Sequence, residues 1–156
     1  QFGYGIYETK NYDRLLERIT DGSRWHFRLT ANPTFSKSQG QGCTEKHVRG
    51  VVIGCGTPEY QAEWLRRRSE KCGFHVRKAD EAYSSDDFTI TKSRYLTFRK
   101  GTDNGRTVKI LSVTFEGELT VTETESFKAA LCDGIGRGKA YGQGLMTIVR
   151  VGEQNG

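Results

Sequence analysis

Apolar and polar residues alternate along two neighbouring stretches of the chain, residues 88 to 98 and residues 111 to 121. A period of two is typical of half-buried strands. The segment KGTDNG at residues 100 to 105 lies between them and is typical of a turn. The pattern therefore predicts a long antiparallel hairpin, with Gly117 as a candidate bulge. The apolar positions of one parity in the first stretch are Phe88, Ile90, Leu96 and Phe98.

Two helices are predicted from their start and stop signals. Thr57 can cap a helix and Pro58 fits its first turn, where no N–H partner is needed; this helix is expected to end at Gly73. The segment TETE at residues 122 to 125 fits a capping box in which the first threonine, Thr122, is the cap. This second helix is expected to end at Gly134.

The order of the predicted elements from residue 47 onward indicates the fold class. A strand at 47 to 53 comes first, followed by the first helix, a strand at 74 to 77, the hairpin, the second helix and a strand at 145 to 151. This is the order of a ferredoxin-like unit, in which two helices cover one face of an antiparallel sheet. We therefore expect an α+β ferredoxin-like domain over residues 47 to 156.

Residues 1 to 35 predict only the second half of another such unit. It consists of a strand, a helix and a strand, at residues 3 to 8, 12 to 19 and 24 to 31. Half a unit leaves its helix and its sheet face uncovered, so we expect a further strand, helix and strand ahead of Gln1. Residues 36 to 46 are rich in Ser, Gln and Gly and indicate a linker. The predicted organisation is two tandem ferredoxin-like domains, the first one incomplete.

Charge and hydropathy narrow the classes of partner. The chain has 24 Lys and Arg against 19 Asp and Glu, a net charge of +5. This surplus favours a polyanion such as nucleic acid, although a solvated basic surface is the alternative. The apolar stretches are far shorter than the ~20 residues that span a membrane. We therefore expect a soluble protein with no membrane partner.

The cysteines and histidines give no sign of a metal site. Cys43, Cys55, Cys72 and Cys132 are far apart and form no C-x-x-C pair, and His47 has no matching ligand spacing. We expect reduced thiols in a cytoplasmic protein, with no metal and no cofactor.

Eleven residues near the end of the chain, GIGRGKAYGQG at 134 to 144, hold five glycines and the cations Arg137 and Lys139. A dinucleotide fingerprint is excluded because a helix precedes this loop and a strand follows it. A P-loop is excluded because Lys139 is followed by Ala140. A loop that approaches a phosphate backbone remains, as does a loop that only needs positive φ angles. On the first interpretation the candidate phosphate-binding residues are Gly134, Gly136, Gly138, Arg137 and Lys139.

Four segments carry a family resemblance. They are FRLTANPTFSK at 27 to 37, EWLRRRSEKCGF at 63 to 74, SVTFEGELTVTETESFKAAL at 112 to 131 and GIGRGKAYGQGLMTI at 134 to 148. In this order and at these separations they resemble the CasE (Cse3) family of CRISPR repeat endoribonucleases, which belong to type I-E systems. The resemblance covers most of the chain.

The resemblance implies a fold and an activity. The family has tandem RRM-like, ferredoxin-like domains. Its members bind the stem-loop of a CRISPR repeat in precursor RNA, cut at its base without a metal, and stay with the mature guide RNA and the other subunits of Cascade. The implied reaction is attack by a ribose 2′-hydroxyl on the adjacent phosphate, which leaves a cyclic phosphate.

Such a reaction needs a base, an acid and cations on the phosphate. The resemblance places the family's catalytic histidine in the segment expected before Gln1, so this chain departs from its family there. We expect weak binding and little cleavage by this chain alone, and a separate chain carrying that segment would restore cleavage. His26, beside Arg24 and Arg28, is a weak candidate for a replacement; His47 and His75 are expected to be structural.

Basic residues on the predicted hairpin resemble the family's basic hairpin in position and charge. They are Lys92, Arg94, Arg99, Lys100 and Arg106. A solvated strand face is the alternative. Arg66, Arg67 and Arg68 cannot all face one way on a helix. A solvated surface is the favoured interpretation for them, and contact of one or two with RNA or another subunit is the alternative. Phe115 is expected in the core rather than in an aromatic RNA platform. Two rival functions stay open, namely a non-catalytic RNA-binding or scaffold subunit and a domain that binds only protein.

Overall fold

A computed structural model describes residues 11–37, 51–76, 88–101 and 105–152. Its helices are α1 (Asp13–Leu16), α2 (Pro58–Lys71), α3 (Thr124–Asp133) and the 3-10 helix η1 (Lys139–Tyr141). Its strands are β1 (Arg24–Ala31), β2 (Thr34–Lys37), β3 (Val51–Gly54), β4 (Phe74–His75), β5 (Phe88–Lys100), β6 (Arg106–Val121) and β7 (Leu145–Arg150). No helix among the described residues is both long and apolar enough to cross a membrane.

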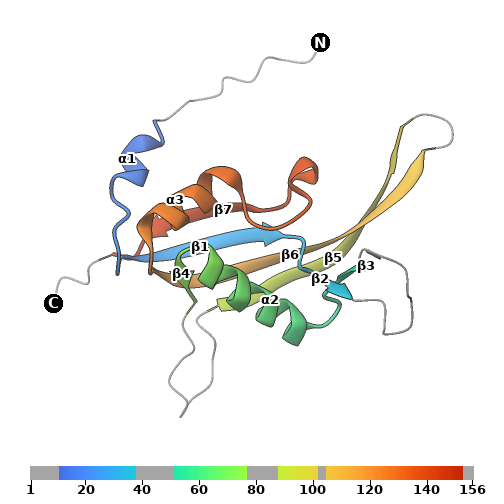
Figure 1. Cartoon of the computed structure of the whole chain (residues 1–156), viewed down its shortest axis with the longest axis horizontal. Coiled ribbons are helices and arrows are strands. Elements are labelled where there is room, and N and C mark those ends of the chain that lie inside the picture. The colour runs from blue at the N-terminus through green and yellow to red at the C-terminus, as the bar shows by residue number, and fades with distance from the viewer. Residues whose placement is uncertain (1–10, 38–50, 77–87, 102–104, 153–156) are drawn as a thin grey trace, which may run out of the picture.

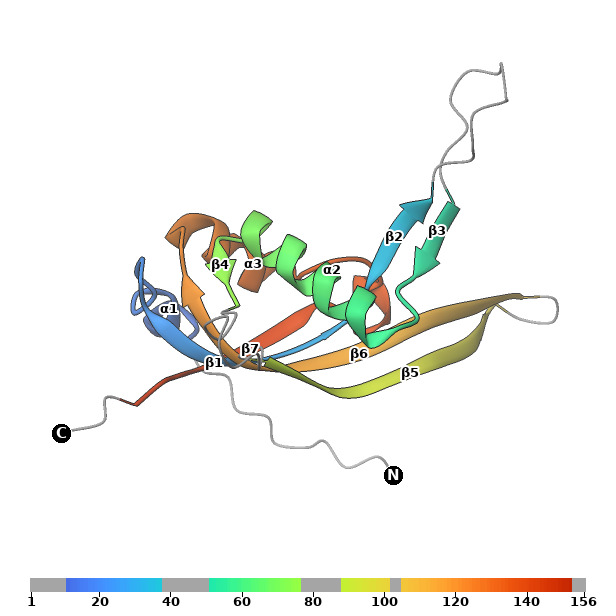
Figure 2. The same cartoon turned by 90° about the horizontal axis from the view of Figure 1, so that it is seen from below.

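The main sheet has the ferredoxin-like strand order. Its strands run β4-β6-β1-β7, with β5 paired to β6, and the pairs with given registers are antiparallel. With α2 after β1 and α3 after β6, this is one split βαβ unit in which β1 is the first strand. Helices α2 and α3 lie on one face of the sheet, and the hairpin of β5 and β6 extends well beyond it (Figures 1 and 2). The predicted α+β class and ferredoxin-like arrangement are confirmed.

The strand that opens this unit was predicted wrongly. β1, which the sequence pattern assigned to the preceding half unit, pairs with β6 on one side and β7 on the other. The segment predicted to open the unit instead contributes β3, which pairs with β2 in a separate two-stranded sheet. The physical reason is burial: β1 alternates fully buried and exposed positions, whereas Val51, Val52 and Ile53 are 50%, 42% and 38% exposed. Residues 24 to 31 therefore belong with the unit expected to begin at residue 47.

Ahead of β1, the described residues add one short helix and the buried core residue Ile19 to this unit. The strand expected at 3 to 8 and most of the expected linker at 36 to 46 lie outside the described residues. The helix expected at 12 to 19 is the single turn α1. Leu15, Leu16 and Ile19 pack against the core beside the sheet.

The core lies between the helices and the sheet. On β1 the alternation places Trp25, Phe27, Leu29 and Ala31 against the helices, at 4% exposure or less. Phe115 of β6 is fully buried and stacks on Trp64 of α2, with ring centroids 6.1 Å apart. Burial of rings of this size is worth roughly 2 to 3 kcal/mol each in transfer free energy. The prediction that Phe115 is a core residue is confirmed.

The β-bulge lies in β5 rather than at Gly117. Gly117 pairs in register with both Phe27 and Phe88, whereas the register of β5 shifts between Ile90 and Lys92. The extra residue reverses the parity of the strand beyond it. Phe88 and Ile90 therefore pack on the core, while the positions of Leu96 and Phe98 lie on the opposite face. The predicted common face for these four residues is wrong for this reason.

The capping residue of α3 also differs from the prediction. Glu123, not Thr122, is the N-cap, and its carboxylate accepts hydrogen bonds from the N–H groups of Glu125 at 3.2 Å and Ser126 at 2.7 Å. The bonds from Ser126 and then Glu125 lower the pKa of Glu123. A carboxylate two or three residues before these donors satisfies the unpaired N–H groups of the first turn as well as a threonine hydroxyl does.

Candidate nucleic-acid interface

The glycine loop, residues 134 to 144, is fixed to the end of β1 by backbone hydrogen bonds. The N–H of Gly144 donates to the carbonyl of Thr30 at 2.7 Å, and the N–H of Ile135 donates to the carbonyl of Gly144 at 2.8 Å. An isolated β-bridge joins Asn32 to Arg137. These bonds hold the loop in one conformation at the end of the sheet.

The fold itself requires two glycines of this loop. Gly136 has φ +85°, and a Cβ there would lie 2.9 Å from Cζ2 of Trp64. Gly144 has φ +92°, and a Cβ there would lie 2.6 Å from the carbonyl oxygen of Ile135. Side chains rarely adopt these φ angles, and the carbonyl cannot move without shifting the backbone. The need for positive φ thus explains these glycines, but it does not explain the cations between them.

A hollow of about 600 Å³, which we call the basic groove, lies between the C-terminal ends of α2 and α3 and the glycine loop. Its lining includes the cations Arg68, Lys71, Arg137 and Lys139. Within residues 11–37, 51–76, 88–101 and 105–152, none of these four forms an ion pair. Asp133 is the acidic residue that lines the groove. The groove therefore carries an excess of positive charge.

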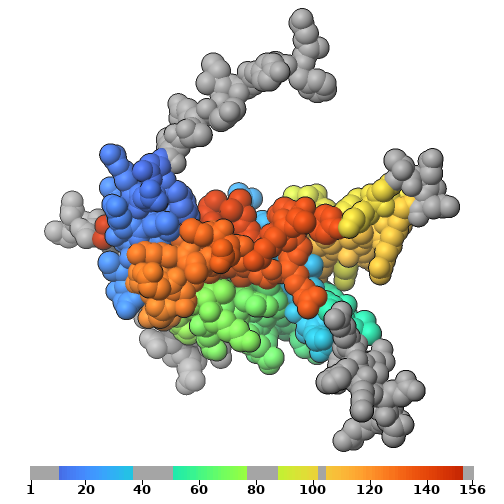
Figure 3. All heavy atoms as spheres, turned by 45° about the horizontal axis from the view of Figure 1, so that its top comes forward, coloured from blue at the N-terminus to red at the C-terminus, as the bar shows by residue number. Residues whose placement is uncertain are grey.

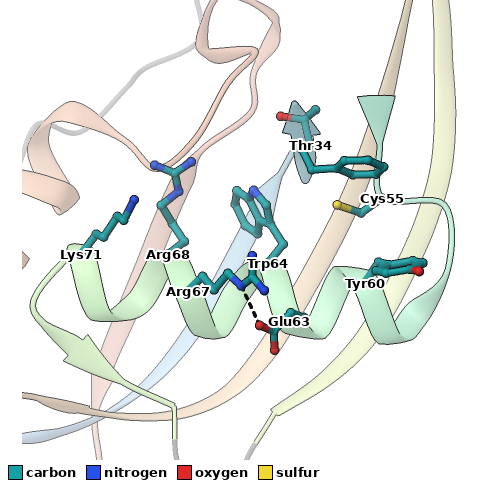
Figure 4. A pocket seen from close by; sticks show the side chains of 9 residues that line it. Thr34, Cys55, Tyr60, Glu63, Trp64, Arg67, Arg68 and Lys71 are labelled. Atoms are coloured by element: carbon teal, nitrogen blue, oxygen red, sulfur yellow. Dashed lines mark hydrogen bonds and ion pairs between the residues drawn. The ribbon is translucent and has the colours of Figure 1, made fainter. Parts of the chain in front are cut away.

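Two of these cations, Arg68 and Lys71, were not among the predicted binding residues. They continue a stripe along α2 that begins with Tyr60 and Trp64, because residues four and three apart share a helix face. The guanidinium of Arg68 lies over the ring of Trp64, 5.7 Å from its centroid. Figure 4 shows Arg68 and Lys71 extending from the helix toward the glycine loop. This spacing was the signal in the sequence that could have identified them.

The three consecutive arginines of α2 do face different ways, as predicted. Arg67 pairs with Glu63 at 2.7 Å, and the guanidinium of Arg66 lies over the ring of Phe88 on the other side of the helix. Arg68 alone of the three lines the basic groove.

The register of the hairpin separates its basic residues into two sets. Lys92, Arg94, Lys100 and Arg106 occupy one face, because Lys92 pairs with Thr114, Arg94 with Ser112 and Lys100 with Arg106. Arg99 pairs with Thr107 and lies on the other face. The structure thus brings four of the five predicted hairpin residues together on one side.

An aromatic contact joins the hairpin to the glycine loop. The ring of Phe98 packs against that of Tyr141 in η1, with centroids 4.8 Å apart. Phe98 shares its face with Lys100 and Arg94, so the basic face is the one that meets the loop. Figure 3 shows the loop (red) beside the hairpin (yellow). The far end of the hairpin and the glycine loop, far apart in sequence, are therefore in contact, whereas Lys92 and Arg94, nearer the sheet, lie on the same face as Thr30 and His26.

His26 lies across the sheet from the basic groove, on the face that it shares by register with Lys92 and Arg94. It is exposed on the face that the helices leave open, with Nδ1 3.6 Å from Oε1 of Glu118. Arg24 pairs with the same Glu118 at 2.5 Å, and Arg28 pairs with Glu116 at 3.1 Å. The weak candidate for catalysis is therefore not part of the basic groove. His75 is exposed on β4, and His47 lies outside the described residues.

The described cysteines are free thiols. They are Cys55, Cys72 and Cys132. Burial raises the pKa of the Cys55 thiol and that of the Cys72 thiol. Among the residues that the structure describes, no three His, Cys, Asp or Glu side chains are grouped to hold a metal ion. Cys43 lies outside the described residues.

The chain is similar in sequence and in structure to known proteins. The family model described as CRISPR associated protein matches residues 2–150. The CRISPR-associated endoribonuclease Cse3 of Thermus thermophilus is 32% identical over 133 residues, which are 83% of this chain and 57% of that protein. A solved structure of CRISPR endoribonuclease Cse3 bound to 19 nt RNA is also 32% identical, with a TM-score of 0.67, and the match covers 85% of this chain and 57% of that one.

A chain from a CRISPR RNA-guided surveillance complex, pre-nicking, shows the same fold at 23% identity, with a TM-score of 0.65. That match covers 96% of this chain and 63% of the other. The present chain thus spans 57% of the length of the Thermus thermophilus relative.

Proposed function

The chain belongs to the family of CRISPR associated proteins, and from this we propose that it binds the stem-loop of a CRISPR repeat RNA as part of an endoribonuclease. In this proposal the enzyme processes precursor RNA without a metal and stays with the mature guide RNA as a subunit of Cascade. The likeness to an endoribonuclease bound to RNA supports the substrate class. The observation that carries the proposal is the basic groove, whose cations have no ion-pair partners among the described residues.

The basic groove suits a phosphate backbone. Arg137 and Lys139 are on a loop whose backbone is held in place, so little conformational entropy is lost when a phosphate binds. Arg68 and Lys71 face them from α2. Phosphate contacts of this kind supply most of the affinity of nucleic-acid binding, and they make it depend strongly on salt.

The basic face of the hairpin suits one strand of a stem. Helical RNA is bound mainly through its phosphates, shape and sugar hydroxyls. Lys92 and Arg94 are two residues apart along β5 and Lys100 is six residues farther, so all three share one face of a strand that rises roughly 7 Å per two residues. With Arg106 opposite Lys100, they line the hairpin up to the point where it meets the glycine loop. We propose that these four residues contact phosphates and that Arg99 does not.

Cleavage needs a proton acceptor at the 2′-hydroxyl and a donor at the leaving oxygen. No histidine lines the basic groove in the part of the chain that the structure describes, and His26 lies across the sheet from it. We therefore keep the proposal that the catalytic histidine is in the segment expected ahead of Gln1. The same observation favours a second candidate function, a non-catalytic subunit that holds guide RNA.

The test is binding and cleavage of a panel of labelled CRISPR repeat stem-loops in EDTA. We expect at least one stem-loop to bind this chain. The double variant Arg137→Ala with Lys139→Ala should weaken binding at least about tenfold and lower the salt slope by about 1.5, since two phosphate contacts are removed. The matched control, Arg14→Ala with Arg18→Ala in and beside α1, removes the same charge from residues that do not line the groove and should change the dissociation constant less than about twofold.

The cleavage arm separates the two candidate functions. A chain that also carries the segment proposed to hold the catalytic histidine should cut the bound stem-loop in EDTA, and the present chain should not. Tight binding by both chains without cutting by either would favour the non-catalytic subunit. If no stem-loop in the panel binds, or if the control pair matters as much as Arg137 and Lys139, the proposed function is wrong.

A further inference from the structure

A second hollow, of about 470 Å³, lies at the other end of the α2 stripe, between this helix and the start of the β2–β3 hairpin. It is lined by Thr34, Phe35, Cys55, Tyr60, Glu63, Trp64, Arg67, Arg68 and Lys71. Its volume is within the range of small-molecule sites. Arg68 and Lys71 also line the basic groove, but the other residues of this pocket have no part in the proposed function so far.

Two exposed aromatic rings face each other across this pocket. Tyr60 is 62% exposed and Phe35 is 45% exposed, yet their ring centroids are only 6.4 Å apart. The ring of Trp64, 8% exposed, lies farther along the same helix face. Large aromatic side chains left in solvent and gathered at a hollow are typical of a site that stacks planar groups.

The charged residues around the rings indicate which kind of planar ligand the pocket fits. Arg67, Arg68 and Lys71 line the same pocket, against one acid, Glu63. Glu63 is already held by Arg67 at 2.7 Å, so its charge is largely compensated. Aromatic rings next to cations fit a base attached to a phosphate, which is a nucleotide. An apolar peptide would leave Arg68 and Lys71 without an anionic partner.

The pocket is continuous with the basic groove. Arg68 and Lys71 line both hollows, and Figure 4 shows them on the side of the pocket toward the glycine loop, with Tyr60 at the far end. A strand whose phosphates lie in the basic groove would therefore reach the aromatic rings after passing these two cations.

We propose that this pocket binds an unpaired nucleotide of the RNA next to the stem, with its base stacked on Tyr60 and Phe35 and its phosphate on Arg68 and Lys71. The proposal rests on the proposed function, because it assumes that the stem lies in the basic groove. Stacking is tolerant of sequence, since every base has an aromatic face. The pocket would thus hold the strand that enters or leaves the stem without selecting its bases.

The test compares three forms of the stem-loop that binds best in the panel: blunt-ended, extended by a few unpaired uridines at the 5′ end, and extended likewise at the 3′ end. At least one extension should tighten binding about five- to tenfold in the wild type. Tyr60→Ala should abolish most of this gain, and Tyr60→Phe should keep it because the ring remains. Tyr12→Ala, an exposed tyrosine (44%) outside the pocket, is the matched control and should also keep it.

A spectroscopic readout reports the contact directly. With 2-aminopurine at the first unpaired position, stacking should quench its fluorescence on binding to the wild type and to Tyr60→Phe, but not to Tyr60→Ala. Blunt-end affinity unchanged in all three variants would show that the variants fold and that the stem site is intact.

The outcomes distinguish a failure of the proposed function from a failure of the nucleotide pocket. If blunt stem-loops do not bind, the proposed function fails first. If they bind but neither extension adds affinity, or if Tyr60→Ala keeps the gain and the quenching, the nucleotide pocket is wrong, and the exposed rings are then better explained as a surface for a protein partner.

Discussion

The two faces of the sheet both carry cations, but they arrange them in different ways. On the open face, Arg24 and Arg28 of β1 lie next to Glu118 and Glu116 of β6, and each pair forms an ion pair. The four charges cancel locally. On the helix side, the basic groove gathers four cations from two separate segments, and none has an acidic partner within the described ranges.

This difference indicates that the arrangement of charge, rather than its amount, is the better guide to where RNA is proposed to bind. Paired charges on an exposed sheet contribute about 0.2 to 1 kcal/mol to stability and project little field. Unpaired cations in a hollow focus a positive potential that attracts a polyanion. The net charge of +5 alone therefore does not locate a binding surface. The cations that form ion pairs must first be separated from those that do not.

The largest effect is expected from a substitution in the glycine loop that changes the shape of the basic groove. Gly144→Ala would place a Cβ 2.6 Å from the carbonyl oxygen of Ile135 at φ +92°, and we expect a loss of about 2 to 4 kcal/mol of unfolding free energy. Gly142→Ala has a similar φ, +75°, but open space around it, and should cost about 1 kcal/mol. Urea unfolding measures both. Equal losses would mean that the close contact at Gly144 has no energetic consequence.

A smaller effect, on stem-loop binding, is expected when the contact between the hairpin and the glycine loop is removed. Phe98→Ala removes the ring that packs on Tyr141, so the basic face of the hairpin is no longer held beside the loop. Stem-loop binding measured by fluorescence anisotropy should weaken by about three- to tenfold, as expected for lost pre-organisation. Tyr95→Ala removes an exposed ring from the other face of the same strand and serves as the control. A similar loss in both variants would contradict the proposed link.

Removal of an ion pair on the open face should change the unfolding free energy only slightly. Arg28→Ala deletes one partner of an exposed ion pair and should lower the unfolding free energy by less than about 1 kcal/mol. The double variant with Glu116→Ala should restore part of that loss, which a double-mutant cycle in low salt would detect. A coupling energy well above 1 kcal/mol would show that the open face contributes more to the fold than its exposure suggests.

The smallest effect concerns the cap of α3 at low pH. Hydrogen bonds lower the pKa of Glu123 in the folded protein, so its stabilising contribution is present above the ordinary glutamate pKa and is lost as pH falls through the lowered value. The melting temperature of the wild type should therefore fall in acid more than that of Glu123→Gln. Parallel curves for the two proteins would contradict the capping role.

Much of the fold could be predicted from the sequence because strong local patterns decide it. The alternation in β1, the hairpin and the start and end of α2 are all found where the pattern placed them. The first strand of the unit was misassigned because Val51, Val52 and Ile53 are as apolar as a core strand. Only pairing shows that β1 is the strand between β6 and β7.

The candidate site was predictable in part. The glycine motif identified Arg137 and Lys139, but the groove depends on packing between α2, α3 and the loop, which no single segment encodes. Arg68 was set aside within a run of three arginines, although its four-residue spacing from Trp64 placed it on the inner stripe. A bulge at one position of β5 places Phe98 on the face where it meets Tyr141. The alternation of apolar and polar residues does not predict such a bulge.

The most direct test of the central claim compares two double variants that remove the same charge from the two faces. Arg68→Ala with Lys71→Ala removes the cations on one side of the basic groove, and Arg24→Ala with Arg28→Ala removes the two ion-paired arginines of β1 on the open face. Stem-loop affinity is measured as a function of salt. We predict that the first variant weakens binding at least about tenfold and lowers the salt slope by about 1.5, while the second leaves the slope unchanged. An equal or larger loss in the second variant would contradict the account, because the ion-paired arginines of β1 would then bind RNA as strongly as the cations of the basic groove.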